Sequence, residues 1–183
     1  PDKGKKKPGK VDDDATYDVL DQLVTEGVIA AYGVSVETMD QALSALRRPN
    51  LTNLQIIFNP FRLKPLDEVL PLAAEKGVAV FARVPLASGL LSGKYTAETT
   101  FDKDDHRTYN RNGEAFDKGE TFSGVPFGEG VAAAGELKAA LPEGVTLPAA
   151  TLAWIASRSG VTSVIPGARS AEQAAANAAA ADL

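Results

Sequence analysis

The stretch VIPGARSAEQAAANAAA, residues 164–180, places a glycine, an arginine and a serine between a short apolar run and an alanine-rich segment. Alanine is the strongest helix former, so a helix is expected to begin here. The N-terminus of a helix presents unpaired N–H groups and favours anions. Arg169, close to Gly167, would add a full positive charge. The pattern indicates either an ordinary turn with Ser170 as the helix cap or a phosphate site.

Polar side chains also stand at the ends of the three preceding apolar runs. These residues are Ser35, Asn59 and Arg83, and Arg169 lies just beyond a fourth run. In parallel α/β proteins, functional residues gather in the loops that follow the C-terminal ends of the strands. The four positions therefore indicate the rim of one site. The alternative is that residues in loops are simply polar because they face water.

The elements that must position these residues alternate along the chain. Apolar runs typical of buried parallel strands cover residues 28–36, 51–60, 78–87 and 161–167. Helical patterns cover residues 14–27, 37–48, 65–77, 147–160 and 170–183. This alternation predicts parallel βαβ units with right-handed crossovers, interrupted by a long polar insertion at about residues 88–130. Four such strands fit either half of a (β/α)8 barrel or a small open sheet, and periodicity alone does not choose between them.

Composition narrows the class of protein. The chain of 183 residues is long enough for one domain with a hydrophobic core. Its net charge of −5 argues against nucleic acid or an anionic membrane as the main partner. The absence of cysteine excludes disulfides, cysteine nucleophiles and cysteine-based metal sites.

Residues 1–14, PDKGKKKPGKVDDD, form a segment rich in lysine and aspartate with no apolar face to bury. We expect a loop or a disordered start here, followed by the folded domain at residues 15–183. The lysines do not lead into the apolar core of a signal peptide, and no run approaches the roughly 20 apolar residues of a membrane span. We therefore expect a cytoplasmic protein with no membrane partner.

Four segments in order resemble the C-terminal half of the aldo-keto reductases, which are NADP(H)-dependent (β/α)8 barrels that reduce carbonyls. The segments are LDQLVTEGVIAAYGVSV, LQIIFNPF, VAVFARVPLASGLLSGKY and VTSVIPGARSAEQAAAN. Within the insertion, DDHRTYNRNGEAFDKGETFSG is similar to a loop of a bacterial branch of the family. The resemblance implies an α/β fold of the (β/α)8 TIM-barrel type. This chain would carry only about the second half of the barrel, its four strands being the fifth to the eighth.

The resemblance also implies an NADP(H) site along the strand ends. Ser35 and Gln55 match residues that hydrogen-bond the nicotinamide carboxamide, and Arg83 stands where many members carry an aromatic residue that stacks on the ring. The loop that wraps the pyrophosphate is matched by Pro85, Leu86, Gly89, Leu91, Gly93 and Lys94. The 2′-phosphate and adenine end is matched by Gly167, Arg169, Gln173 and Asn177.

The family's proton donor is a tyrosine supported by lysine, aspartate and histidine, and these four residues come from the first four strands. No segment of this chain matches them. His106 is the sole histidine and is predicted to lie in a loop, and Tyr32, Tyr95 and Tyr109 have no recognisable lysine–aspartate pair beside them. We therefore expect no catalytic residue in this chain. The acidic cluster of Asp102, Asp104 and Asp105 is predicted to be solvated rather than to bind a metal ion.

The sequence thus predicts the cofactor-binding half of an oxidoreductase that reduces aldehydes or ketones to alcohols with NADPH. The expected partners are the nicotinamide cofactor, a small carbonyl substrate, and either the missing N-terminal half barrel or a second copy of this chain. The alternative is a non-catalytic half-barrel fragment or an assembly module that uses its exposed strand edges. An unrelated phosphate-binding α/β protein is a third, weaker alternative, because it would not explain four matching segments in order.

Overall fold

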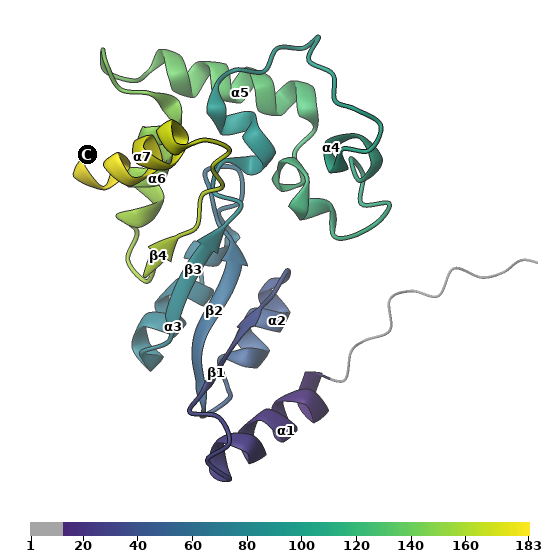
Figure 1. Cartoon of the computed structure of the whole chain (residues 1–183), viewed down its shortest axis with the longest axis vertical. Coiled ribbons are helices and arrows are strands. Elements are labelled where there is room, and N and C mark those ends of the chain that lie inside the picture. Colours follow the sequence, from purple (N-terminus) through teal and green to yellow (C-terminus); the bar gives the residue numbers. More distant parts are fainter. Residues whose placement is uncertain (1–12) are drawn as a thin grey trace, which may run out of the picture.

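A four-stranded parallel sheet forms the centre of the protein, whose computed structural model describes residues 13–183 (Figure 1). The strands are β1 (Tyr32–Ser35), β2 (Leu51–Ile57), β3 (Ala79–Arg83) and β4 (Ser163–Val164), paired in that order. The predicted parallel α/β sheet is confirmed, with β1 and β4 shorter than their apolar runs. All but the end of the predicted loop at residues 1–14 lies outside the described residues.

Helices connect the strands, and their ends follow from local chemistry. The α-helices are α1 (Asp13–Thr25), α2 (Met39–Ala45), α3 (Val69–Lys76), α4 (His106–Tyr109), α5 (Phe127–Ala139), α6 (Leu147–Ala156) and α7 (Ala171–Ala179). The 3-10 helices are η1 (Lys64–Leu66), η2 (Ala87–Ser92), η3 (Lys118–Glu120), η4 (Phe122–Gly124) and η5 (Ala180–Asp182). Thr38 and Gln41 form a capping box at α2, and the predicted cap Ser170 accepts the Gln173 N–H at α7. Among residues 13–183, no helix is long and apolar enough to cross a bilayer.

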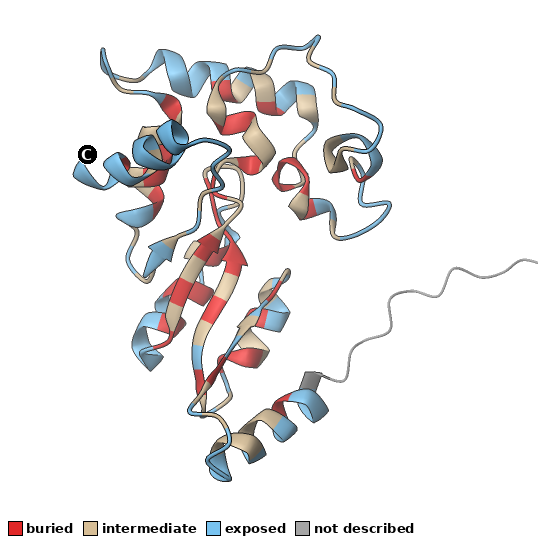
Figure 2. Cartoon of the chain, viewed as in Figure 1, coloured by how far each residue is buried: buried red, intermediate tan, exposed pale blue. Residues whose placement is uncertain are grey.

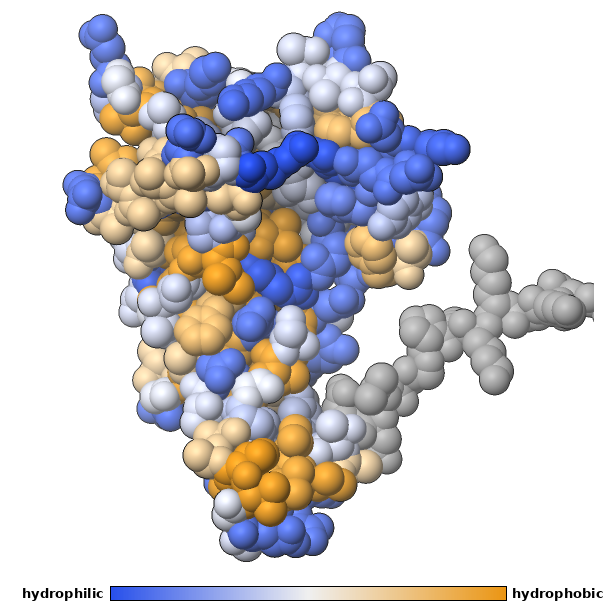
Figure 3. Space-filling view, viewed as in Figure 1, coloured by the Kyte–Doolittle hydropathy of each residue, from blue (hydrophilic) through white to orange (hydrophobic). Residues whose placement is uncertain are grey.

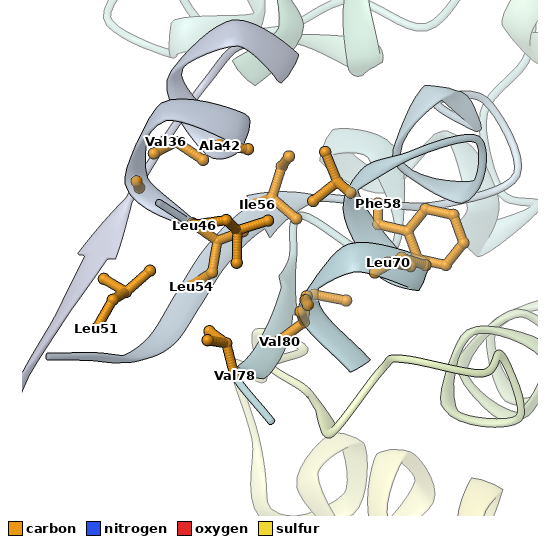
Figure 4. Packing of buried hydrophobic residues seen from close by; sticks show 14 of the residues in the cluster. Val36, Ala42, Leu46, Leu51, Leu54, Ile56, Phe58, Leu70, Val78 and Val80 are labelled. Atoms are coloured by element: carbon orange, nitrogen blue, oxygen red, sulfur yellow. The ribbon is translucent and has the colours of Figure 1, made fainter. Parts of the chain in front are cut away.

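One face of the sheet is buried against helices. Along β2 and β3, fully buried residues alternate with partly exposed ones (Figure 2). Leu54, Ile56, Val80 and Ala82 point to the same side and join one hydrophobic cluster with residues of α2 and α3 (Figure 4). Trp154 of α6 packs at the edge of this cluster. This burial is the main hydrophobic stabilisation of the sheet.

The other face of the sheet is not covered by a described helix, and we call it the open face (Figure 1). The alternate strand residues lie on it, and these are Gly33, Ser35, Asn53, Gln55, Ile57, Ala79, Phe81 and Arg83. Ile57, at the end of β2, is nevertheless fully buried. The space-filling view shows polar and apolar residues mixed over this side of the sheet (Figure 3). Within residues 13–183, neither β1 nor β4 has a strand on its outer edge. The sheet therefore has one bare face and two unpaired edges.

The polar insertion is packed around a hydrophobic cluster of its own. Buried residues of this second cluster are Ala87, Leu90, Leu91, Phe122, Ala134 and Leu147. Helix α5 contributes to it and is an element that the sequence patterns above do not predict. Its sequence carries three glycines, which weaken a helical pattern. Gly130 allows a close approach to Leu90, because a Cβ there would lie 2.6 Å from Cδ1 of Leu90.

Gly160 lies in the turn between α6 and β4, and its substitution tests how tightly this turn packs on α3. Its φ is +88°, and a Cβ would lie 2.6 Å from the carbonyl oxygen of Leu70. Gly144 has a similar φ of +82° but open space around it. Gly144→Ala should lower the free energy of unfolding by about 1–2 kcal/mol, the cost of left-handed backbone. Gly160→Ala should lower it by roughly a further 1–3 kcal/mol through the clash. Urea denaturation measures both, and equal losses would contradict the packing.

Candidate functional site

A cavity of about 900 Å³ opens beyond the C-terminal ends of β3 and β4. Three segments distant in sequence line it: the chain after β3, the insertion, and the turn before α7. A second cavity of about 440 Å³ shares Leu86, Lys94, Gly167 and Gln173 with the first and continues towards α6. We call the two together the strand-end groove. Its position is the one at which parallel α/β proteins bind ligands.

The strand-end groove brings together nine of the thirteen predicted site residues. These are Pro85, Leu86, Gly89, Gly93, Lys94, Gly167, Arg169, Gln173 and Asn177. Ser35, Gln55 and Arg83 lie instead on the open face, where Ser35 and Gln55 are neighbours in register. Leu91 is fully buried in the second cluster and lines neither cavity.

The charge of the strand-end groove is positive. Lys94, Arg107 and Arg169 line the larger cavity together with His106, and Glu120 is the one acidic residue among its described lining residues. The carboxylate of Glu120 is neutralised by an ion pair with Arg83. A concave site with this excess of cations favours an anionic ligand.

The turn after β4 is held by its own side chains. The Arg169 N–H donates to Oε1 of Gln173 at 2.7 Å, and Nδ2 of Asn177 donates to the Gly167 carbonyl at 3.2 Å. Gln173 and Asn177 thus fix the backbone of the turn. The exposed Arg169 guanidinium has no hydrogen bond or ion pair with the described residues. It remains available to a phosphate.

The insertion supplies a second, rigid cation. Arg107 donates to both carboxylate oxygens of Asp105 at 2.8 and 2.5 Å and to the hydroxyl of Tyr95 at 2.5 Å. Its guanidinium also lies 4.3 Å from the ring centroid of Phe101. These hydrogen bonds from Arg107 lower the pKa of Asp105 below its usual value. Tyr95, His106 and Arg107 are lining residues that the sequence patterns did not assign to the site, because nothing local places the insertion beside β4.

The acidic cluster of the insertion does not converge. Asp102 and Asp104 are exposed, whereas Asp105 is paired with Arg107. Across residues 13–183, no three histidine, aspartate or glutamate side chains come together as a metal ion would require. Asp105 is the member of the cluster that contacts a residue lining the groove, because it forms an ion pair with Arg107.

Backbone strain is concentrated at the two ends of the insertion. The described non-glycine residues with positive φ are Val84, Ala87, Ser88, Phe122 and Ser123. Val84 at φ +50° is unusual because β-branched residues avoid this region. The Ser88 hydroxyl donates to the Glu120 carbonyl at 2.9 Å and accepts the Phe122 N–H at 3.1 Å. Strain of this kind persists only where surrounding contacts impose it, and it gathers at functional sites.

At the rim, two strand-end residues tie the insertion to the sheet. The buried amide of Asn59 donates to the Val84 carbonyl at 2.9 Å and to the Ser123 hydroxyl at 2.7 Å. Arg83 donates through Nη1 to Glu120 and through Nη2 to the Val36 carbonyl at 3.0 Å. Its Nε is buried and has no hydrogen-bond partner. A buried donor without a partner is energetically costly.

Comparison with known proteins identifies the family to which this chain is similar. A sequence model described as "Aldo/keto reductase family" matches residues 6–183. The aldo-keto reductase YhdN of Bacillus subtilis is 33% identical over 95 residues, which cover 52% of this chain and 29% of YhdN. The oxidoreductase Rv2298 of Mycobacterium tuberculosis is 34% identical over 165 residues, which cover 88% of this chain and 47% of that protein.

Solved structures agree with these relatives. The holo form of the aldo-keto reductase AKR11C1 from Bacillus halodurans superimposes with a TM-score of 0.67 and 25% identity. The match covers 94% of this chain and 51% of that chain. This chain therefore spans about half the length of the solved relative, and its four strands correspond to part of a (β/α)8 barrel.

Asp105→Asn tests whether the Arg107 pair stabilises the insertion. The substitution removes a charge-assisted hydrogen-bond pair, so the free energy of unfolding should fall by about 1–3 kcal/mol at pH 7. The folded pKa of Asp105 lies below its unfolded value, so this contribution is present above about pH 5 and is lost as pH falls through 4 and below. Wild type and variant should therefore converge in acid. Thermal unfolding followed by circular dichroism measures this, with exposed Asp104→Asn as the control. Equal effects of the two substitutions would refute the assigned role.

Proposed function

This chain belongs to the aldo/keto reductase family, and from that premise we propose that it carries the cofactor-binding half of an NADP(H)-dependent oxidoreductase. The reaction would be the reduction of aldehydes or ketones to alcohols. One observation carries the proposal: Lys94 and Arg169, which have no ion pair with the described residues, converge on a single groove at the strand ends. Two cations from separate segments suit a ligand that bears several phosphates.

The residues of the strand-end groove fit the phosphate end of this cofactor. Arg169 would pair with the 2′-phosphate, since its guanidinium has no described partner. The loop from Pro85 to Lys94 would hold the pyrophosphate, with Gly89 and Gly93 at φ of +96° and +67° shaping its backbone. Arg107 lines the groove from the insertion, with its charge offset by the ion pair with Asp105.

The open face fits the nicotinamide end. Ser35 and Gln55 lie side by side in register, and Arg83 follows on the same face of the neighbouring strand. The side chain of Arg83 is held at this face by Glu120 and by the Val36 carbonyl. When bound, the nicotinamide supplies the hydride. The residues of this chain bind the cofactor and orient it at the open face.

The proton donor would come from outside the described residues. The hydroxyl of Tyr32 donates to Asp21 at 2.9 Å, and burial together with that hydrogen bond raises the pKa of Tyr32. A proton donor at neutral pH needs the opposite shift. The hydroxyl of Tyr95 is occupied by Arg107. We therefore propose that a complementary N-terminal half barrel provides the donor, because a second copy of this chain would bring only the same tyrosines.

The second candidate is a non-catalytic assembly module, and the bare sheet favours it. The unpaired outer edges of β1 and β4, within the part of the chain described, can each accept a partner strand. Val28 beside β1 is 65% exposed, which adds apolar surface near that edge. Both candidates require a partner for the same sheet and differ in whether the chain binds NADPH.

The cytoplasmic location stays a prediction.

Arg169→Ala tests the phosphate end. NADPH carries the 2′-phosphate and NADH does not, so the variant should bind NADPH at least about tenfold more weakly and NADH nearly unchanged. Fluorescence titration of each cofactor against the whole chain gives the dissociation constants. Arg47→Ala, in the turn after α2 and outside the strand-end groove, is the control and should change neither. An equal loss for both cofactors would remove Arg169 from the 2′-phosphate.

Light scattering during size-exclusion chromatography tests the partner. If a second copy supplies the missing half, the measured mass should be twice the 19.1 kDa of the chain. Added NADPH should strengthen that dimer because each site would be built by both copies. A monomer that binds no NADPH would instead favour the non-catalytic module. A dimer that ignores NADPH would separate assembly from cofactor binding.

A further inference from the structure

An asparagine followed by a glycine lies in the turn after α4. Asn112 is the one asparagine of the chain that a glycine follows. Both Asn112 and Gly113 are exposed, and the turn lies at the outer side of the insertion (Figure 1). Gly113 has a φ of +85°, in the left-handed region, so the turn itself favours glycine at this position. The fold thus keeps this pair of residues in contact with water.

The pair has the chemistry of a site for spontaneous deamidation. Asparagine is thermolabile because the chain can attack its side-chain amide. The Gly113 amide nitrogen loses its proton to solvent base and bonds to Cγ of Asn112, and ammonia leaves with a proton from water. Glycine has no Cβ to obstruct the closure of this imide ring. Water then opens the ring to aspartate or isoaspartate, so one water is consumed and one ammonia is released.

Two contacts oppose this ring closure in the folded chain. The carboxylate of Glu114 accepts the backbone N–H of Asn112 at 2.9 Å and its side-chain Nδ2 hydrogen at 2.8 Å. We call this pair of bonds the Glu114 clip, and it lowers the pKa of the Glu114 carboxyl below its usual value. The Gly113 N–H donates to the Asn110 carbonyl at 3.1 Å. The amide and the nitrogen that attacks it are therefore both held, and both contacts must open before the ring can form.

The product would not fit the turn. A carboxylate at position 112 would place an oxygen where Nδ2 now lies 2.8 Å from the Glu114 carboxylate. Two ionised carboxylates repel at this distance, and neither has a hydrogen to donate. The turn should therefore open after the reaction. Its next residues, Ala115 and Phe116, each donate a backbone N–H to the buried Asn110 at 2.8 Å, and Phe116 lines the strand-end groove.

We propose that Asn112–Gly113 is a site of spontaneous deamidation and that the Glu114 clip sets its rate. The reaction is intramolecular apart from water, so it needs no enzyme and no cofactor, and it does not depend on the proposed function. Its rate reports how often the turn after α4 opens. The modified chain carries one more negative charge in the segment that leads to Phe116.

The experiment incubates the whole chain in mildly alkaline buffer and follows each asparagine by peptide mapping with mass spectrometry. We expect Asn112 to convert to aspartate and isoaspartate, whereas the buried Asn110 stays intact. Glu114→Ala should speed this conversion at least about threefold, because an exposed charge-assisted contact no longer holds the amide. Glu98→Ala, at another exposed glutamate of the insertion, is the matched control and should leave the rate unchanged.

Two results would overturn the inference. The first is an intact Asn112 under conditions in which a synthetic peptide of residues 108–118 deamidates. The second is the same rate in wild type and Glu114→Ala, which would remove the role of the clip. Circular dichroism checks that each variant is folded, and Glu114→Gln replaces Glu114→Ala if the latter is not. Asn112→Gln should abolish the signal, because glutamine would have to close a larger ring.

Discussion

Successive residues of a β-strand point to opposite faces of its sheet, and this constraint arranges the rest of the molecule. In β2 and β3 it sends Leu54, Ile56, Val80 and Ala82 into the helices. The residues between them, Gln55 and Phe81, lie on the opposite face. Most of the hydrophobic burial is therefore on one side of the sheet, and the other side is available for a ligand or a partner.

The insertion forms one wall of the strand-end groove. An insertion without packed side chains would not hold this position, because its backbone groups can hydrogen-bond equally well to water. Its own hydrophobic cluster gives it a fixed shape, and the buried Asn59 joins it to β2 through Ser123. Left-handed backbone at Val84 and Ser123 is the conformational cost of this closure. Arg107 and Glu120 reach the site because these contacts hold the insertion there.

Charge is distributed unevenly along the site. The strand-end groove is basic, with Arg169 and Lys94 exposed. Where the insertion meets the open face, three carboxylates, those of Glu37, Asp117 and Glu120, lie near the two guanidiniums of Arg62 and Arg83. The chain spans about half the length of the solved relative.

The sequence alone determined the alternation of strands and helices, the cap at Ser170 and the family. It did so because periodicity, capping and motif order are local properties. Ser35, Asn59, Arg83 and Arg169 could be assigned to one edge of the sheet, because parallel strands end at the same edge. The sequence did not indicate α5, because its three glycines weaken the helical pattern. The packing of Gly130 against Leu90, which appears only in the tertiary structure, accounts for one of these glycines. Nor did it indicate the pairing of Arg83 with Glu120, which lie 37 positions apart. Contacts at such separations depend on how the insertion packs, and only the tertiary structure decides that.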